Sequence, residues 1–193
     1  RRPPYSRAKA YAEHALMRMH REQGLPVTIL RPGIVVGEGS SPFHSGIGLY
    51  NREQHCLGWN RGDNPLPLEL AEDTASAILL ALERAQAIGR TYNVAGDVRL
   101  TAREYTAELG RALGRRLHYH PQSLVKQQLI EIGKWLVKQA IGRRDAPPSF
   151  ADLKSRGLVA HFDTGDIKGD LGWQPVADRD EFIRKAIDVH RNG

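Results

Sequence analysis

The sequence has little cysteine, few aromatic residues and no long apolar run. Cys56 is the only cysteine among 193 residues, which excludes an internal disulfide framework and a zinc site built from several cysteines. No stretch approaches the roughly 18 uninterrupted apolar residues of a membrane-spanning helix. With 40% hydrophobic and 26% charged residues, the chain has the composition of a globular domain with a real core. A single thiol suits a reducing compartment, so we expect a cytoplasmic protein.

The charge balance is basic, with a formal net charge of +6. Such a balance can indicate nucleic acid, an anionic membrane or an acidic ligand as a partner. The basic residues are spread along the chain, however, and form tight pairs only at Arg1-Arg2, Arg115-Arg116 and Arg143-Arg144. No aromatic platform or recognition motif accompanies them, so we expect a solvated surface and no nucleic-acid binding.

Helical and strand-like segments alternate along the chain, which predicts an α/β fold. The helical spacing of apolar residues and the capping signals predict helices at 5–23, 75–86, 101–113, 123–141 and from 178 to about 189, with short ones near 152 and 164. Asp73 is the expected cap of the second helix, and Thr101 with Glu104 forms a capping box. Extended segments are expected at 27–30, 33–37, 65–70, 91–95 and 116–120. After the segment 33–37, we expect a long loop that reaches to about residue 64.

Tyr5 and Lys9 are four residues apart at the start of the first predicted helix. This spacing places both side chains on one face, one turn apart. A lysine ammonium near a phenol favours the phenolate, so such a tyrosine can exchange a proton with a substrate hydroxyl or carbonyl near neutral pH. The same spacing is common on ordinary helices, so by itself it does not establish catalysis.

Five segments in a fixed order strengthen this interpretation. They are Tyr5-Ser-Arg-Ala-Lys9 with the strand that ends in Arg31-Pro32 and continues to Gly37, then 72–82, 89–96, 100–105 and 171–175. Together they resemble the extended short-chain dehydrogenase/reductase family, which includes NAD-dependent epimerases and dehydratases. No single segment is specific, but the ordered set covers nearly the whole chain.

The resemblance implies a role for several residues. Tyr5 would be the general acid/base, and Lys9 would stabilise its phenolate and hold the nicotinamide ribose of NAD or NADP. The cofactor would supply the hydride chemistry. The nicotinamide side of its site would be lined, largely through backbone, by Pro32, Gly33, Ile34 and Val35.

The resemblance also implies the architecture. The chain would be the C-terminal portion of a Rossmann-type parallel-sheet fold with a smaller α/β substrate-binding lobe. Residues of about 1–37 and 71–100 would belong to the Rossmann side, and those of about 38–70 and 101–193 to the substrate lobe and C-terminal helices. The resemblance is also compatible with a homodimer of the parent protein, that is, of the full-length protein to which this chain would belong.

The family's Gly-x-x-Gly-x-x-Gly turn, which places the pyrophosphate at a helix N-terminus, does not occur in the sequence. We therefore expect a fragment without the N-terminal dinucleotide-binding half. The parent would be an NAD(P)-dependent oxidoreductase, epimerase or dehydratase acting on a hydroxyl or carbonyl, and the chain alone would be inactive.

The substrate would be a small molecule. Many sugar-nucleotide members carry an arginine a few residues before the acidic pair 72–73, where this chain has Leu66, which cannot grip a diphosphate. The sequence therefore favours a substrate other than a diphosphate sugar. The candidate substrate-binding residues are Arg31 at the end of a strand and His44, Tyr50 and Arg61 in or after the long loop.

Two other features leave alternatives open. His118 and His120 lie on one face of a predicted strand but have no third ligand at suitable spacing, so we expect no metal site. The helix at 123–141 is amphipathic and basic, and we expect it to pack on its own core rather than on a membrane. The alternative function is a non-catalytic NAD(P)-sensing or scaffold protein of the same fold, whose helix at 123–141 contacts a partner or a membrane.

Overall fold

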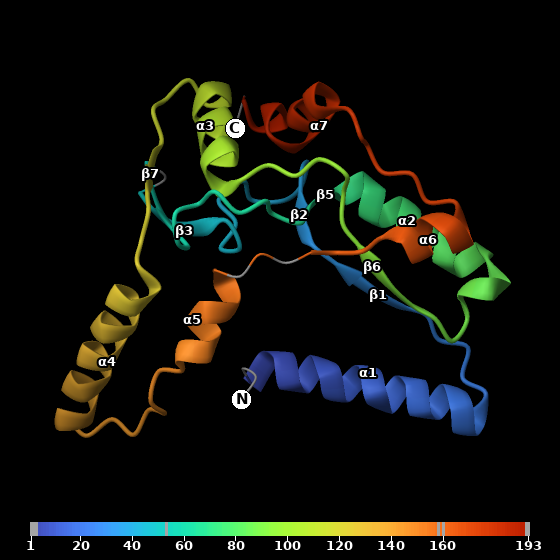
Figure 1. The fold of residues 1–193 in the computed structure, drawn as a ribbon, viewed down its shortest axis with the longest axis horizontal. Coiled ribbons are helices and arrows are strands. Elements are labelled where there is room, and N and C mark those ends of the chain that lie inside the picture. Colours follow the sequence, from blue (N-terminus) through green and yellow to red (C-terminus); the bar gives the residue numbers. More distant parts are fainter. Residues whose placement is uncertain (1–3, 53, 158, 160, 192–193) are drawn as a thin grey trace.

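A computed structural model describes residues 4–52, 54–157, 159 and 161–191 (Figure 1). The expected α/β fold is confirmed, with helices and short, partly parallel strands in alternation. In chain order, the elements are α1 (Pro4–Gln23), β1 (Ile29–Pro32), β2 (Ile34–Val36), β3 (Gly48–Asn51), β4 (His55–Gly58), β5 (Leu68–Leu70), α2 (Ala71–Glu83), β6 (Thr91–Val94), α3 (Ala102–Ala112), β7 (His118–His120), α4 (Leu124–Ala140), α5 (Phe150–Arg156), α6 (Gly165–Leu171) and α7 (Arg179–Ala186).

The strand that follows α1 changes its pairing partner at Gly33. β1 runs parallel to β6, with Ile29 opposite Thr91, and β2 runs parallel to β5, with Ile34 opposite Leu68. At the change, Gly33 N donates to the Val94 carbonyl (2.8 Å) and Ile34 N donates to the Pro67 carbonyl (2.7 Å). A Cβ atom on Gly33 would lie 2.1 Å from the Pro67 oxygen, so only glycine allows this approach.

Two apolar clusters lie on either side of this change of partner. The larger one joins β2, β5, α3 and α7, and its buried members include Val36, Leu70, Leu100, Tyr105 and Phe182. The smaller one joins α2, β6 and α6 through Ala77, Tyr92, Val94, Ile167 and Trp173. The C-terminal segment therefore contributes to both clusters.

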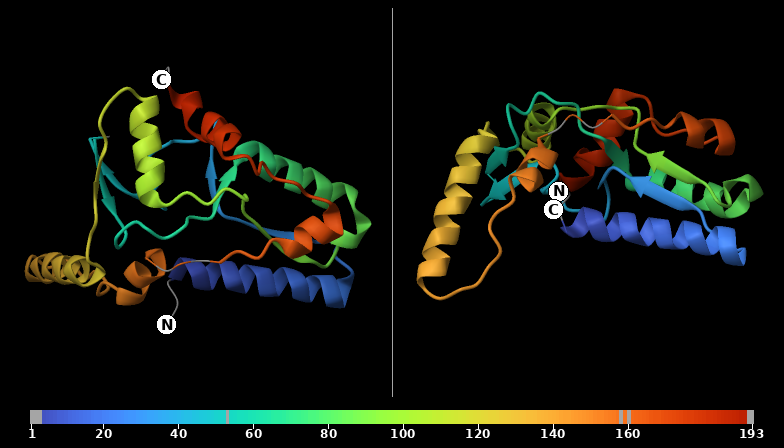
Figure 2. Two further views of the ribbon diagram at one scale, coloured as in Figure 1. Left: turned by 45° about the horizontal axis from the view of Figure 1, so that its top comes forward. Right: turned by 60° about the horizontal axis from the view of Figure 1, so that its bottom comes forward.

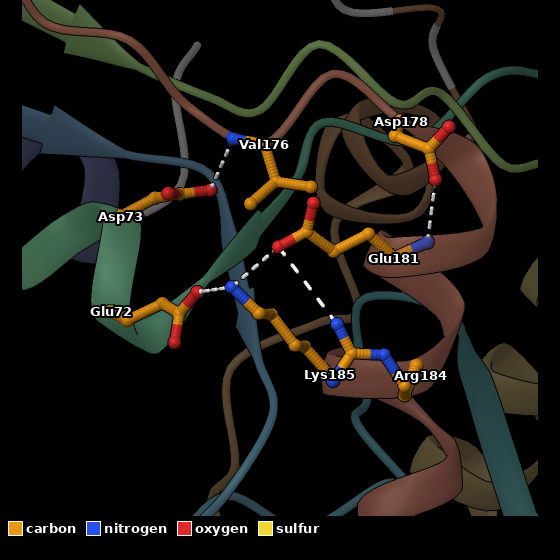
Figure 3. Close-up of polar contacts among 7 residues, drawn as sticks. All are labelled: Glu72, Asp73, Val176, Asp178, Glu181, Arg184 and Lys185. Atoms are coloured by element: carbon orange, nitrogen blue, oxygen red, sulfur yellow. Dashed lines mark hydrogen bonds and ion pairs between the residues drawn. The ribbon is translucent and has the colours of Figure 1, made fainter.

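The acidic pair at the start of α2 connects this helix to the C-terminal segment (Figure 3). The expectation that Asp73 caps a helix beginning at 75 is wrong, because α2 begins at Ala71 and its N-cap is Leu70. The buried Asp73 carboxylate instead accepts from Val176 N at 3.2 Å. Lys185 of α7 lies between the carboxylates of Glu72 and Glu181. A charged pair that resembles a helix cap in sequence thus binds backbone and side chains about 100 residues away.

A second sheet contains β7, which confirms the extended segment expected at 116–120, and two further strands that the sequence did not indicate. Within the expected loop, β3 and β4 form an antiparallel hairpin, and β7 adds to β4 in parallel. The capping box of Thr101 and Glu104 is confirmed at the start of α3. Both views of Figure 2 place α4 at the outer edge of the molecule. The expectation that α4 packs its apolar face on the core is wrong, because none of its residues is buried.

Replacing Gly33 by alanine should destabilise the full-length protein by about 1–3 kcal/mol, because the new methyl group meets fixed backbone at Pro67. Gly133→Ala is the control, since a Cβ there meets nothing within 4 Å and the helix interior favours alanine by about 0.5–1 kcal/mol. Urea unfolding measures both free energies. Equal effects of the two substitutions would contradict the packing argument.

Candidate active site

The direction of α1 relative to β1 decides which residues meet at the sheet's end. The two elements run in opposite directions, so the first turns of α1 lie near the carboxyl end of β1 (Figure 1). Glu13 of α1 and Arg31 of β1 fix this arrangement with a bidentate pair, in which Arg31 Nε lies 3.0 and 3.1 Å from the two carboxylate oxygens. The hydrogen bonds from Arg31 lower the pKa of Glu13.

Tyr5, Lys9 and Glu13 follow at intervals of four residues and therefore share one side of α1. From Glu13 back to Tyr5 the helix covers about 12 Å, and from Arg31 forward to Val35 an extended chain covers about 13 Å. The Glu13–Arg31 pair thus sets the register that places the first turn of α1 level with residues 32–35.

The side chains of Tyr5 and Lys9 are exposed at this end of α1, Tyr5 by 72%. The Lys9 ammonium lies 5.8 Å from the centre of the Tyr5 ring. This is the geometry of a cation–π contact between the two side chains. The pair is thus open to a bound molecule, and its role in catalysis stays a prediction.

Glu69 binds the backbone of the segment 32–35. The sequence did not indicate this role. The side chain of Glu69 is fully buried, and its carboxylate accepts from Gly33 N at 3.3 Å and from Thr74 Oγ1 at 2.7 Å. Burial raises the pKa of Glu69, although both hydrogen bonds favour the ionised form. The signal in the sequence is a lone charged residue between two leucines of an otherwise apolar strand.

The four candidate substrate residues occupy different places. Arg31 is engaged by Glu13. His44 is exposed, and its Nδ1 accepts from Gly46 N at 3.0 Å. Tyr50 turns inward, with its ring edge on Phe43 at 5.0 Å between centroids, and burial raises the pKa of its phenol.

Arg61 lines a surface hollow of about 700 Å³ between the 60–64 loop and the starts of α4 and α5. In the part of the chain that the structure describes, no hydrogen bond or ion pair joins these four residues to Tyr5 or Lys9. Their roles in substrate binding stay predictions.

A third imidazole joins the two histidines that the sequence placed on one strand. His55 of β4 stacks on His118 of β7 at 5.5 Å, and its Nδ1 lies 2.9 Å from His120 Nε2. Within the described residues, no group of three or more His, Cys, Asp or Glu side chains has the geometry to hold a metal ion. Cys56 is buried nearby, and burial raises the pKa of its thiol.

Comparison with known proteins supports the resemblance. Residues 1–95 match the model of the NAD dependent epimerase/dehydratase family. Over 99 residues, the chain is 34% identical to a (4-alkanoyl-5-oxo-2,5-dihydrofuran-3-yl)methyl phosphate reductase of Streptomyces griseus, and the match covers 51% of this chain and 33% of that protein.

Solved structures extend the likeness to almost the whole chain as a fold. The dTDP-glucose 4,6-dehydratase DesIV of Streptomyces venezuelae, solved with NAD, superposes with a TM-score of 0.66 at 20% identity, covering 98% of this chain and 51% of that one. The protein RMD of Pseudomonas aeruginosa, solved with NADPH, gives a TM-score of 0.63 at 16% identity, covering 98% and 55%.

Residues 1–95 therefore resemble the NAD-dependent epimerase/dehydratase family, and the Rossmann-type fold expected from the sequence is confirmed. The 99-residue match covers about a third of the curated relative, and the chain spans about half the length of the solved neighbours.

The buried Glu69 predicts a pH-dependent stability. Because its pKa is higher in the folded state, its contribution is present at acid pH and is lost as pH rises through that folded-state pKa. Glu69→Gln should flatten the fall in unfolding free energy that the full-length protein shows as pH rises above the ordinary titration range of glutamate. Urea unfolding across this range is the measurement.

Glu83→Gln at the exposed end of α2 is the matched control and should keep the fall seen in the unchanged protein. If Glu69→Gln shows the same slope as the unchanged protein, the carboxyl does not titrate in the way that its burial implies.

Proposed function

We propose that this chain supplies the acid/base pair and part of the nicotinamide and substrate surfaces of an NAD(P)-dependent oxidoreductase, epimerase or dehydratase. The observation that carries the proposal is the exposed pair of Tyr5 and Lys9, with the ammonium 5.8 Å from the ring centroid. The family match over residues 1–95 includes this pair and residues 32–35.

In the proposed chemistry, the Tyr5 phenol oxygen exchanges a proton with the hydroxyl or carbonyl oxygen of the substrate. Lys9 stabilises the phenolate when Tyr5 has given up its proton. NAD(P), when bound, would supply the hydride acceptor or donor for the neighbouring carbon of the substrate. Glu69 and the glycine at 33 hold the backbone of 32–35 in the position where the nicotinamide ring would bind.

The residues present fit one end of the cofactor. Lys9 is exposed and can donate to ribose hydroxyls, and the extended backbone of 32–35 presents a flat surface to a planar ring. The glycine-rich turn that would hold the pyrophosphate does not occur in residues 1–193. The proposal therefore assigns the pyrophosphate to residues outside this chain and leaves the choice between NAD and NADP open.

For the substrate, we propose a hydroxyl or carbonyl compound without a nucleoside diphosphate. Leu66 packs against the larger apolar cluster, so the position where related sugar-nucleotide enzymes carry a diphosphate-binding arginine offers no charge. Arg61 is the nearest replacement in sequence, in the hollow beside the 60–64 loop.

Tyr5→Phe should lower turnover of the full-length protein by about 10²–10⁴-fold, because the variant keeps the ring but loses the proton-transferring oxygen. The measurement is steady-state oxidation of NADH and NADPH with a panel of carbonyl substrates, monitored by cofactor fluorescence.

Tyr11→Phe on the same helix is the matched control, since Tyr11 is equally exposed but outside the Tyr–Lys pair. Near-equal turnover of Tyr5→Phe and the unchanged protein would refute the assignment. A protein that binds the cofactor but exchanges hydride with none of the panel would favour the non-catalytic sensing function.

A further inference from the structure

Helix α4 carries a broad apolar surface that the described residues do not cover. Val125, Leu129 and Leu136 form one stripe, with exposed fractions of 60%, 64% and 56%. Ile130, Val137 and Ile141 form an adjacent stripe, exposed by 45%, 64% and 70%. At 3.6 residues per turn the two stripes together occupy an arc of about 160° around the helix. We call this arc the α4 apolar face.

The rest of the protein contacts the opposite side of α4, where Leu124, Ile132 and Trp135 are half-buried together with three glutamines. Gln128 donates to the Pro148 carbonyl at 3.0 Å, and Trp135 and Gln139 both donate to the Asp145 carbonyl, at 2.8 and 2.9 Å. The chain that returns from α4 to α5 therefore packs on the glutamine side. An ordinary surface helix packs the other way, with its apolar stripe on the core.

The charges around the α4 apolar face are mainly positive. Between 123 and 145 there are five basic residues against two acidic ones, the basic ones being Lys126, Lys134, Lys138, Arg143 and Arg144. Glu131 pairs with Lys134 at 2.8 Å and Asp145 with Lys138 at 3.6 Å. Lys126 stands within the apolar arc, where its long stem allows its ammonium to reach a polar layer.

This pattern matches an anionic lipid surface better than a second copy of the chain. Apolar side chains flanked by lysine and arginine are the mark of a helix that lies in the plane of a membrane interface, with its apolar side at the acyl boundary. Two α4 apolar faces brought together would instead place Lys126 of each copy in the shared interface, where like charges repel. Anionic headgroups would neutralise these same charges.

The position of α4 allows such a contact. The helix is about 26 Å long and lies at the outer edge of the molecule in both views of Figure 2, with its neighbour α5 on one side only. No helix among the described residues is long and apolar enough to cross a membrane. In such a contact, α4 would therefore lie on the bilayer surface.

We infer that α4 binds the surface of anionic lipid bilayers through its apolar face, with Lys126, Lys134, Lys138 and the arginines at 143 and 144 facing the headgroups. The inference concerns an element separate from α1 and does not depend on the proposed enzymatic function.

The test is co-sedimentation of the full-length protein with vesicles of phosphatidylcholine alone and with phosphatidylserine added. The protein should bind the vesicles that contain phosphatidylserine, and added salt should weaken the binding. The double substitution Leu129→Glu with Leu136→Glu should lower the partition coefficient at least about tenfold, because each change puts a carboxylate in place of an inserted apolar side chain. Both residues are exposed, so circular dichroism should show an unchanged fold.

Leu82→Glu is the matched control, because Leu82 is 79% exposed on α2, far from α4 in the sequence, and its substitution should leave vesicle binding unchanged. Lys134→Glu with Lys138→Glu should reduce binding to the anionic vesicles. The inference is overturned if the unchanged protein binds neither vesicle, or if Leu129→Glu with Leu136→Glu binds as well as the control. A change in oligomeric state by that double variant, without vesicle binding by the unchanged protein, would also overturn it in favour of a protein partner.

Discussion

The close backbone packing at Gly33 is the constraint on which the rest of the structure depends. One continuous stretch of chain pairs with β6 before this residue and with β5 after it, and the 2.1 Å approach that a Cβ would make to Pro67 leaves no room for a side chain. The β6 side carries α1 through the Glu13–Arg31 pair, while β5 leads directly into α2. The segment proposed to face nicotinamide is therefore also the joint between the two sides of the molecule.

Burial of charge around this joint follows one principle. Glu69 and Asp73 lie four residues apart, are both buried, and have pKa values that burial raises. Each carboxylate accepts a backbone N–H from a distant segment, Gly33 for Glu69 and Val176 for Asp73, which offsets part of the desolvation cost. A hydrophobic residue at either position would bury more favourably, but Val176 N would lose the Asp73 acceptor and Gly33 N would keep only the Val94 carbonyl. The two acids thus specify which segments meet β5 and α2.

The sequence predicted the parts whose signals are local. The capping box of Thr101 and Glu104 marks the start of α3, and the structure confirms it. The sequence missed the hairpin of β3 and β4, whose four-residue strands are too short to display an alternating pattern. It misjudged Asp73 and overlooked Glu69 because their partners lie 103 and 36 residues away, which no local pattern encodes. For α4 the amphipathic pattern was correct, but periodicity does not tell what an apolar face packs against.

The two proposals rest on elements that differ in how the fold supports them. Tyr5 and Lys9 lie on a helix fixed to the sheet by a bidentate ion pair, so their exposure accompanies a defined position, as a site for proton transfer requires. The α4 apolar face has no such support: three side-chain donors on the opposite side of the helix bind the returning chain at Asp145 and Pro148. Burying an exposed apolar surface against an external partner is favourable, because it removes apolar side chains from water. Acid/base chemistry depends on α1 being held, whereas binding to a bilayer depends on α4 being left uncovered.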